Sequence, residues 1–276
     1  MRSVNCDIAI VGLGPAGAAA AKAAAQSGLS VVAIDRKQRA GEPVQCAELV
    51  PALFAHHAPL GPAIAQPIAA MHTYVEARPK HVQPCFPGHI ISRTRFDSDL
   101  VAQAQDAGAG VILGQRVTCI RRDGMIGLSD GREIFAAVII AADGPRSLIG
   151  AAAGRTNAAL IETRQITVPL RAPHDATDIF LSADIPGGYG WLFPKRDTAH
   201  VGVGVDAAFR TRLKPLLERL RSKLLDEARI GAEVLAITGG AIPAGGILDP
   251  VAAIGGRPVL LAGDAAGLAN PVTGAG

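Results

Sequence analysis

Small and acidic residues follow three apolar segments that lie far apart in this chain. Gly12-Leu13-Gly14-Pro15-Ala16-Gly17 follows Ile8–Val11, Asp143-Gly144 follows residues 137–142, and Gly263-Asp264 follows residues 259–262. Glycine lets backbone approach a phosphate group closely, and a helix that begins there favours an anion. A carboxylate at the end of a strand accepts hydrogen bonds from sugar hydroxyls. The three segments therefore predict a site for a ligand that contains phosphate and sugar groups.

The first segment lies in residues 4–35, which predict a β-α-β unit that binds a dinucleotide. In this pattern the first glycine permits the turn, the second admits the pyrophosphate and the third lets helix and strand pack closely. An acid at position 35 would bind a ribose and repel a 2′-phosphate, which favours FAD or NAD over NADP. A glycine turn in another α/β protein is the alternative, but strand, glycines, helix, strand and acid all occur in order. The candidate residues are Gly12, Gly14, Pro15, Ala16, Gly17, Asp35 and Arg36.

The Gly-Asp pair near the end of the sequence indicates a long cofactor that is held at both ends, and FAD fits. Asp264 would bind a ribityl hydroxyl beside Gly263. Gly274 and Ala275, in the turn 271–276, would present N–H groups to the flavin edge that becomes anionic on reduction. Asp143 and Gly144 fit the same site, although Asp-Gly-Pro also favours an ordinary turn.

Composition excludes several classes of protein. The net charge is +3 with scattered basic residues, which argues against nucleic-acid binding. No apolar stretch is long enough for a membrane helix, and the N-terminus does not resemble a signal peptide. The four cysteines form no CxxC pair, so we expect no metal site, no disulfide framework and a cytoplasmic location.

The order of elements predicts an α/β fold: a Rossmann-like FAD-binding domain with an inserted antiparallel-sheet substrate domain. Alternating strands and helices at the start favour a parallel sheet, and period-two alternation after residue 155 favours antiparallel strands. We expect the FAD-binding domain over 1–154 and 247–276, and the substrate-binding domain over 155–246 with a long helix at about 206–229. Pro215 predicts a kink in this helix or a later start. The stop at Gly276, directly after a glycine turn, suggests a truncated sequence.

The chain resembles the geranylgeranyl reductase family within the p-hydroxybenzoate hydroxylase-like flavoproteins. The resemblance rests on residues 188–195, Gly-Tyr-Gly-Trp-Leu-Phe-Pro-Lys, followed by Val-Gly-Val-Gly at 201–204, and on the cysteine-containing segment 41–48. It implies that Arg93 and Val117 help to hold the flavin. It also implies that Cys46, Tyr189 and Trp191 line the substrate cavity, where Cys46 would assist proton delivery or shape the cavity. The alternatives are that Cys46 is a small buried residue, that the aromatic residues are core, and that Glu48 is either a proton donor or a surface acid.

The resemblance implies an enzyme that reduces C=C bonds of an isoprenoid chain by hydride transfer from reduced FAD. The alternatives are an FAD-dependent monooxygenase acting on an aromatic or polyketide-like ring, and a truncated protein that binds FAD without catalysis. No second glycine fingerprint is visible, so we expect NADPH to bind transiently or ferredoxin to replace it as the electron donor. An apolar substrate would suit peripheral contact with a membrane. The sequence names neither the exact substrate nor the oligomeric state.

Overall fold

The computed structural model describes the chain except residues 1–2, 57–59 and 276. The chain divides into two units. The first comprises Met1–Pro43, Thr94–Ala158 and Pro243–Gly276, and the second comprises Val44–Arg93 and Ala159–Ile242. Residues 44–93 thus lie in the second unit, whereas the sequence placed them in the first domain. The physical reason is strand pairing, because a strand of this segment joins the sheet of the second unit.

The first unit is built on a mainly parallel sheet. Its strand order is β17-β18-β11-β1-β2-β8, with β9 and β10 attached to β11 as a hairpin. β17 runs antiparallel to β18. The strands are β1 (Ser3–Val11), β2 (Val31–Ile34), β8 (Gly110–Ile112), β9 (Val117–Ile120), β10 (Ile126–Leu128), β11 (Glu133–Ala141), β17 (Val251–Ile254) and β18 (Arg257–Leu261); the helical segments are α1 (Pro15–Gln26), α2 (Arg93–Asp106), α3 (Leu148–Ala152) and η4 (Gly263–Ala266).

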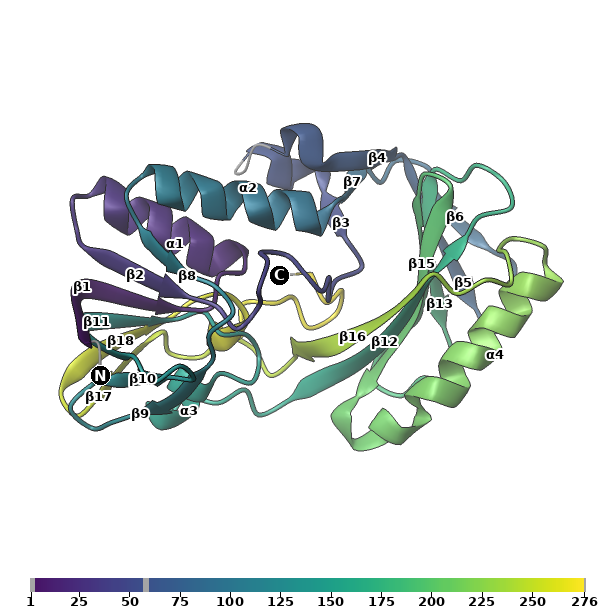
Figure 1. The fold of residues 1–276 in the computed structure, drawn as a ribbon. Coiled ribbons are helices and arrows are strands. Elements are labelled where there is room, and N and C mark those ends of the chain that lie inside the picture. Colours follow the sequence, from purple (N-terminus) through teal and green to yellow (C-terminus); the bar gives the residue numbers. More distant parts are fainter. Residues whose placement is uncertain (1–2, 57–59, 276) are drawn as a thin grey trace. The chain divides into compact units, whose positions relative to one another are not determined.

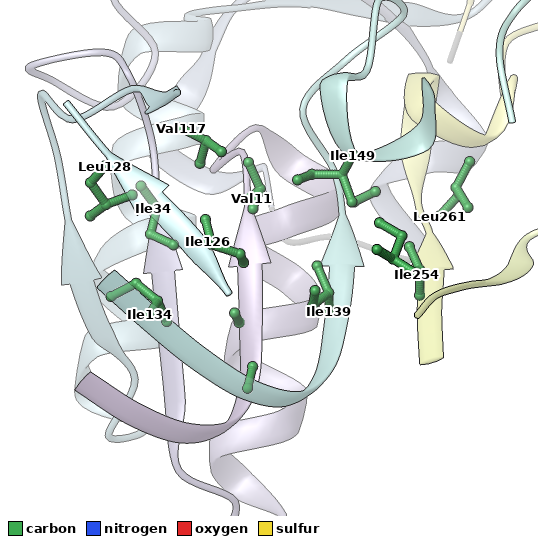
Figure 2. Close-up of a cluster of buried hydrophobic side chains, with 14 of the residues drawn as sticks. Val11, Ile34, Val117, Ile126, Leu128, Ile134, Ile139, Ile149, Ile254 and Leu261 are labelled. Carbon is green, nitrogen blue, oxygen red and sulfur yellow. The ribbon is translucent and has the colours of Figure 1, made fainter. Parts of the chain in front are cut away.

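Both faces of this sheet are covered, which explains why its central strands β1 and β11 end in the apolar runs Ile8–Val11 and 138–141. Helices α1 and α2 lie side by side over β1, β2 and β8 (Figure 1), and their residues Ala18, Ala21 and Val101 pack against Ile10. A second cluster, which includes residues of the β9–β10 hairpin and Ile149 of α3, fills the other face (Figure 2). The parallel sheet agrees with the sequence analysis.

The second unit contains a larger mixed sheet and a small one. The larger has the order β16-β12-β15-β14-β13-β5-β6, and the smaller has the order β3-β7-β4. Neighbours β12 to β13 pair antiparallel as expected, but β13 pairs with β5 in parallel. The strands are β3 (Leu49–Pro51), β4 (Ile64–Ile68), β5 (Ala70–Val75), β6 (His81–Gln83), β7 (Gly88–Ile91), β12 (Leu160–Pro169), β13 (Ala176–Leu181), β14 (Gly190–Lys195), β15 (Thr198–Asp206) and β16 (Ala236–Pro243); short helical turns are η1 (Ala52–His56) and η2 (Gly61–Ala63).

The helix expected at about 206–229 is divided into two parts. Asp206 caps a 3-10 segment, η3 (Ala207–Arg212), by accepting a hydrogen bond from the N–H of Ala208. The α-helix α4 begins only afterwards, at Leu213–Asp226. Pro215 then falls in the first turn, where its missing N–H costs nothing, so the later start is confirmed. No helix among the described residues is both long and apolar enough to cross a membrane.

The core of the second unit lies between α4 and one face of the larger sheet. Leu216, Leu217, Leu220 and Leu224 pack against alternate residues of β15, namely Val201, Val203 and Val205. The other residues of β15 face the opposite side, where the smaller sheet contributes Ile68 and Ile90 to a separate cluster around Trp191 and Phe193. The larger sheet is therefore covered on both faces.

We predict that Leu224→Ala destabilises the second unit. Leu224 is fully buried, so the lost contacts and the cavity should cost about 2–5 kcal/mol of unfolding free energy. Urea denaturation measures this. Ser222→Ala, at an exposed position of the same helix, is the control and should change the free energy by less than about 0.5 kcal/mol. Equal effects of the two substitutions would contradict this assignment of the core.

Candidate functional site

Four strands of the first unit end level with one another. Leu261, Ala141, Val11 and Ile34 form one row across β18, β11, β1 and β2. The residues that follow these strands therefore share one edge of the sheet. They are the sequence-predicted Gly12, Asp35, Asp143, Gly144, Gly263 and Asp264. In open parallel sheets, ligands bind at this carboxyl edge.

The first glycine segment forms a tight cradle with one open position. A Cβ on Gly12 would lie 2.2 Å from the carbonyl oxygen of Ala142, and one on Gly17 would lie 1.9 Å from the carbonyl oxygen of Gly12. Gly12 also has φ +97°. A Cβ on Gly14, by contrast, would meet nothing within 4 Å. Of these three glycines only Gly14 thus faces open space, which is the place where a pyrophosphate would approach.

The N-terminus of α1 starts at this open position. Pro15 occupies the first turn, and no side chain among the described residues caps the end at Gly14. The first N–H groups of a helix and its dipole favour an anion. Pro15 and Ala16 form the start of this helix, and their contact with a cofactor stays a prediction.

Asp35 is held by backbone groups on both carboxylate oxygens. Oδ2 accepts a hydrogen bond of 2.7 Å from the N–H of Leu13, and Oδ1 accepts one of 2.8 Å from the N–H of Lys37. Each oxygen keeps a second lone pair for a ribose hydroxyl. The neighbouring Arg36 is exposed to solvent. The contacts fix the orientation of the carboxylate beside the glycine cradle.

Asp143 caps a helix in this structure. Its Oδ1 accepts a hydrogen bond from the hydroxyl of Ser147, and its Oδ2 accepts hydrogen bonds from the N–H groups of Leu148 and Ile149 at the start of α3. Gly144 has φ +87°, and a Cβ there would meet nothing within 4 Å. Asp143 therefore shapes the turn, and a cofactor contact in this turn would come through Gly144. The side chain of Val117 packs in the core, and this residue pairs with Leu128 of β10, so its contact with the flavin stays a prediction.

The second Gly-Asp segment lies beside the first glycine segment. A Cβ on Gly263 would lie 2.9 Å from the Cβ of Ala16, so η4 packs directly on the start of α1. Asn157 supports this segment by donating a hydrogen bond of 2.9 Å to the carbonyl oxygen of Asp264. The two motifs that were separated in sequence are thus adjacent.

The turn near the end of the chain satisfies its own N–H groups. The N–H of Gly274 donates to the carbonyl oxygen of Asn270, and the N–H of Ala275 donates to Oγ1 of Thr273. The flavin contact expected for Gly274 and Ala275 would require these groups to exchange partners, and it stays a prediction. Gly276, the last residue of the expected turn, lies outside the described residues.

In the second unit, a buried carboxylate joins the cysteine segment to three distant parts of the chain. Oε1 of Glu48 accepts a hydrogen bond of 2.7 Å from the N–H of Arg93. Its Oε2 lies 2.7 Å from Nε2 of His200 and is paired with Nζ of Lys195. Glu48 is only 1% exposed. It is therefore a buried side chain, not the surface acid that the sequence left open.

The electrostatics of this cluster keep Glu48 ionised. Burial alone would raise the pKa of this carboxyl, but the hydrogen bonds from His200, Lys195 and the Arg93 N–H outweigh burial and hold the pKa below its usual value. An ionised carboxylate accepts hydrogen bonds and has no proton to give. This result removes Glu48 as a proton donor at neutral pH.

Cys46 lies two residues before this carboxylate. Its Sγ accepts a hydrogen bond of 3.2 Å from the N–H of Glu48. Its carbonyl oxygen accepts one of 3.3 Å from Nε2 of Gln165. All four cysteines are free, and Cys46 is half-buried. The thiol is therefore partly accessible, and its residue is held by two separate contacts.

Tyr189, Trp191 and Phe193 share one face, as their spacing predicted. The Tyr189 and Trp191 ring centroids are 6.0 Å apart, and those of Trp191 and Phe193 are 6.3 Å apart. Trp191 and Phe193 are buried in the cluster with Ile68 and Ile90, whereas Tyr189 is half-buried at its border. Trp191 and Phe193 are thus core residues, which was the alternative to a role in lining the substrate cavity. Burial also raises the pKa of Tyr189.

A second polar cluster lies on the α4 side of the larger sheet. Asp178 is fully buried and accepts hydrogen bonds from His72 (3.0 Å) and His174 (3.1 Å). The ligand atoms of these three residues lie within 4.8 Å of one another, close enough for a metal ion. However, the guanidinium of Arg229 pairs with the same carboxylate oxygen as His174. This positive charge would repel a cation, so the arrangement fits an ion-pair network better than a metal centre.

Sequence reasoning missed Gln165, His200 and Asp178, and it gave Lys195 no role beyond the motif. Gln165 and His200 do stand out in one respect. Each is a polar side chain that its strand buries, since Gln165 is 4% exposed and His200 is 6% exposed. A buried polar residue requires a partner. Their partners come from other parts of the chain, so the alternation of residues along a strand gives no information about these partners.

Comparisons with known proteins agree on one family. The model of the geranylgeranyl reductase catalytic domain matches residues 160–242. A digeranylgeranylglycerophospholipid reductase from Methanopyrus kandleri is 35% identical, and the match covers 98% of this chain and 72% of that protein. The crystal structure of a geranylgeranyl bacteriochlorophyll reductase-like protein from Thermoplasma acidophilum is similar with a TM-score of 0.88 and 26% identity, over 99% of this chain and 74% of that one.

A more distant structure shares the fold alone. A probable FAD-dependent monooxygenase from Pseudomonas aeruginosa has a TM-score of 0.67 at 17% identity, over 98% of this chain and 81% of that one. This likeness supports the predicted fold class, and it carries no information about which reaction this chain catalyses.

We predict that Glu48→Gln reduces the acid sensitivity of the second unit. Because the folded-state pKa of Glu48 is depressed, its stabilisation is present above the unfolded-state pKa of about 4.3 and is lost as pH falls through the folded-state pKa. The variant should be less stable than the wild type near neutral pH. Its free energy of unfolding should change less than the wild type's when the pH falls from about 6 to about 3.

Urea denaturation across this pH range makes the measurement. Asp130→Asn is the control, because Asp130 also has a lowered pKa but lies on the surface beside Arg132. Solvent screens such pairs, so this substitution should change the pH dependence much less. Parallel pH profiles for the wild type and Glu48→Gln would contradict the assignment.

Proposed function

This chain belongs to the geranylgeranyl reductase family, and from that premise we propose that it reduces C=C bonds of an isoprenoid chain with FAD as its cofactor. The relative from Methanopyrus kandleri is named for a digeranylgeranylglycerophospholipid, and we propose a lipid of this class as the substrate. The observation that carries the proposal is the presence of two features within one chain. The first unit has a tightly packed glycine segment that leaves open space at Gly14, and the second unit matches the family's catalytic domain.

The residues of the first unit fit FAD. Gly14 leaves open space at the start of α1, and the helix N-terminus there has no side-chain cap among the described residues. Asp35 presents a fixed carboxylate for a ribose, and Gly263 brings the second motif next to Ala16. When bound and reduced, FAD supplies a hydride. The described residues thus provide groups for phosphate and sugar from two parts of the sequence.

The second unit would supply the substrate contacts and the proton. An isolated C=C bond is a poor electrophile, so its reduction requires a proton donor and close positioning. Glu48 is excluded as the donor by its lowered pKa. We propose that the Cys46 thiol assists proton delivery and that Tyr189, at the border of the aromatic cluster, contacts the apolar chain. Trp191 is buried, so it would affect the reaction only through residues that it contacts, such as Gln165.

The electron donor would be NADPH, bound transiently, or ferredoxin. The glycine fingerprint at 12–17 is used for FAD in this proposal, and no second one is visible in the sequence. An apolar lipid substrate also favours peripheral contact with a cytoplasmic membrane surface. Comparing flavin reduction rates with NADPH and with reduced ferredoxin distinguishes the two donors.

We predict that the flavin-loaded protein, supplied with a reductant, adds hydrogen to a digeranylgeranylglycerophospholipid. Mass spectrometry of the extracted lipid should show the mass increase of one H₂ for each reduced bond. Unchanged lipid in the presence of bound, reduced flavin would refute the proposed reaction. Oxygen consumption that depends on an aromatic substrate would instead support the monooxygenase, which shares this fold.

We predict that Gly14→Ala weakens flavin binding while the fold is retained. The backbone at Gly14 has φ −68°, which alanine adopts easily, and the new Cβ would meet no protein atom within 4 Å. It would occupy the space of the pyrophosphate, so the Kd for FAD should rise at least about tenfold. Titration of flavin fluorescence measures Kd. Ser27→Ala, at the other end of α1, is the control and should bind FAD like the wild type.

Urea denaturation without flavin completes this test. Gly14→Ala should unfold at nearly the wild-type urea concentration, because its effect requires the ligand. A variant that binds FAD with wild-type affinity would show that the cofactor does not lie at this cradle.

A further inference from the structure

We propose that Gln165 and Glu48 are positioning residues for the Cys46 thiol, and that Gly202 and Trp191 act through Gln165. This inference rests on the proposed function, in which Cys46 takes part in the reaction. None of these four residues needs to touch the substrate. Together they fix the two peptide groups that follow Cys46 in the chain.

The first half of the arrangement is a row across the larger sheet. Trp191 of β14 pairs with Gly202 of β15, and Gly202 pairs with Gln165 of β12. The indole lies across Gly202, because a Cβ there would be only 2.2 Å from Cζ2 of Trp191. Across this bare strand, Nε1 of Trp191 reaches Oε1 of Gln165 at 3.0 Å. The missing side chain of Gly202 thus permits a hydrogen bond between strands that are not neighbours.

The bond from the indole orients the Gln165 amide. Gln165 is 4% exposed, so both ends of its amide require partners. Its oxygen accepts from Trp191, which leaves its nitrogen to donate, and Nε2 donates to the carbonyl oxygen of Cys46 at 3.3 Å. A reversed amide would lose both bonds. Trp191 therefore determines which group Gln165 presents to Cys46.

The second half of the arrangement is the Glu48 anchor. The N–H of Glu48 donates to Sγ of Cys46. The Glu48 backbone has φ +64°, a conformation that is unfavourable for a residue with a side chain. It is held there by the contacts of the carboxylate with Arg93 N–H, Lys195 and His200, and by a bond from the N–H of Ile91 to the Glu48 carbonyl. Moving this N–H away from the sulfur would disrupt buried, charged hydrogen bonds.

The two halves act on different atoms of one residue. Gln165 holds the carbonyl oxygen of Cys46, and Glu48 holds its sulfur. The alternative is that these polar groups maintain the fold and leave the thiol unaffected. The alternatives differ in a measurable property, namely how readily a half-buried thiol reacts with a reagent from solvent.

The test measures the alkylation rate of each cysteine with iodoacetamide by peptide mass mapping. The variants are Gln165→Met, which removes both amide bonds at similar volume, Gly202→Ala and Glu48→Gln. Each should accelerate labelling of Cys46 at least about fivefold, the change in local opening expected when a buried hydrogen bond is lost. Gly202→Ala combined with Gln165→Met should not exceed Gln165→Met alone, because both interrupt the same row.

The other cysteines and one variant serve as controls. Cys85 and Cys119 are exposed, so their labelling rates measure the activity of the reagent itself. Cys6 is half-buried in β1 of the first unit, so its labelling rate measures general unfolding. Asp178→Asn removes an equally buried carboxylate with three side-chain partners from the other face of the same sheet. It should leave the Cys46 rate unchanged. Equal acceleration of Cys6, or a Cys46 rate at or below the wild-type value in Gln165→Met, overturns the proposal.

Turnover separates this inference from the proposed function. In the same variants kcat should fall while KM changes little, since the thiol and not lipid binding is disturbed. If the wild type leaves the lipid unreduced but the labelling results hold, the proposed function fails and the positioning stands. If the wild type reduces the lipid and the variants label like the wild type, the positioning fails and the function stands.

Discussion

The position of the cysteine segment in the second unit depends on a buried negative charge, that of Glu48. Removing a carboxylate from water is costly unless hydrogen bonds and opposite charge replace the water. Glu48 obtains these from residues 93, 195 and 200, which lie at the start of α2, on β14 and on β15. The cost of leaving any partner unsatisfied ties the cysteine segment to two strands of the larger sheet and to residue 93. The thiol that we propose takes part in the reaction accepts a hydrogen bond from the N–H of Glu48 itself.

In the first unit the main constraint is that the chain leaves open space at the start of α1. Its parallel strands end level with one another, and small or acidic residues follow them. Gly12 and Gly17 allow backbone segments to touch, whereas Gly14 keeps a volume free of protein atoms. Two glycines of one motif therefore serve packing within the protein, and the third leaves the space in which we propose that the cofactor binds. The cofactor proposal depends on this distinction.

Much of the first unit could be predicted from the sequence, because its signals are local. The strand, the glycines, the helix and Asp35 occur within one short stretch, and the structure keeps their order. The second unit was harder to predict, because its interactions are long-range. Pairing of β5 with β13 joins residues about a hundred positions apart, and two partners of Glu48 are more distant still. The start of the helix was also uncertain, because Asp206 favours a helix that begins at 207 and Pro215 favours a later one. In the structure Asp206 caps η3, and Pro215 lies in the first turn of α4.

Strand β15 gives its two faces opposite characters. Valines at 201, 203 and 205 fill the core beneath α4, while glycines at 202 and 204 leave the other face bare. The indole of Trp191 fills the space above Gly202, so positions 191 and 202 share one volume. Among relatives, a larger residue at the position of Gly202 should therefore accompany a smaller ring or an aliphatic residue in place of Trp191. Such pairs would lose the indole donor as well, and a different group would have to orient the amide at position 165.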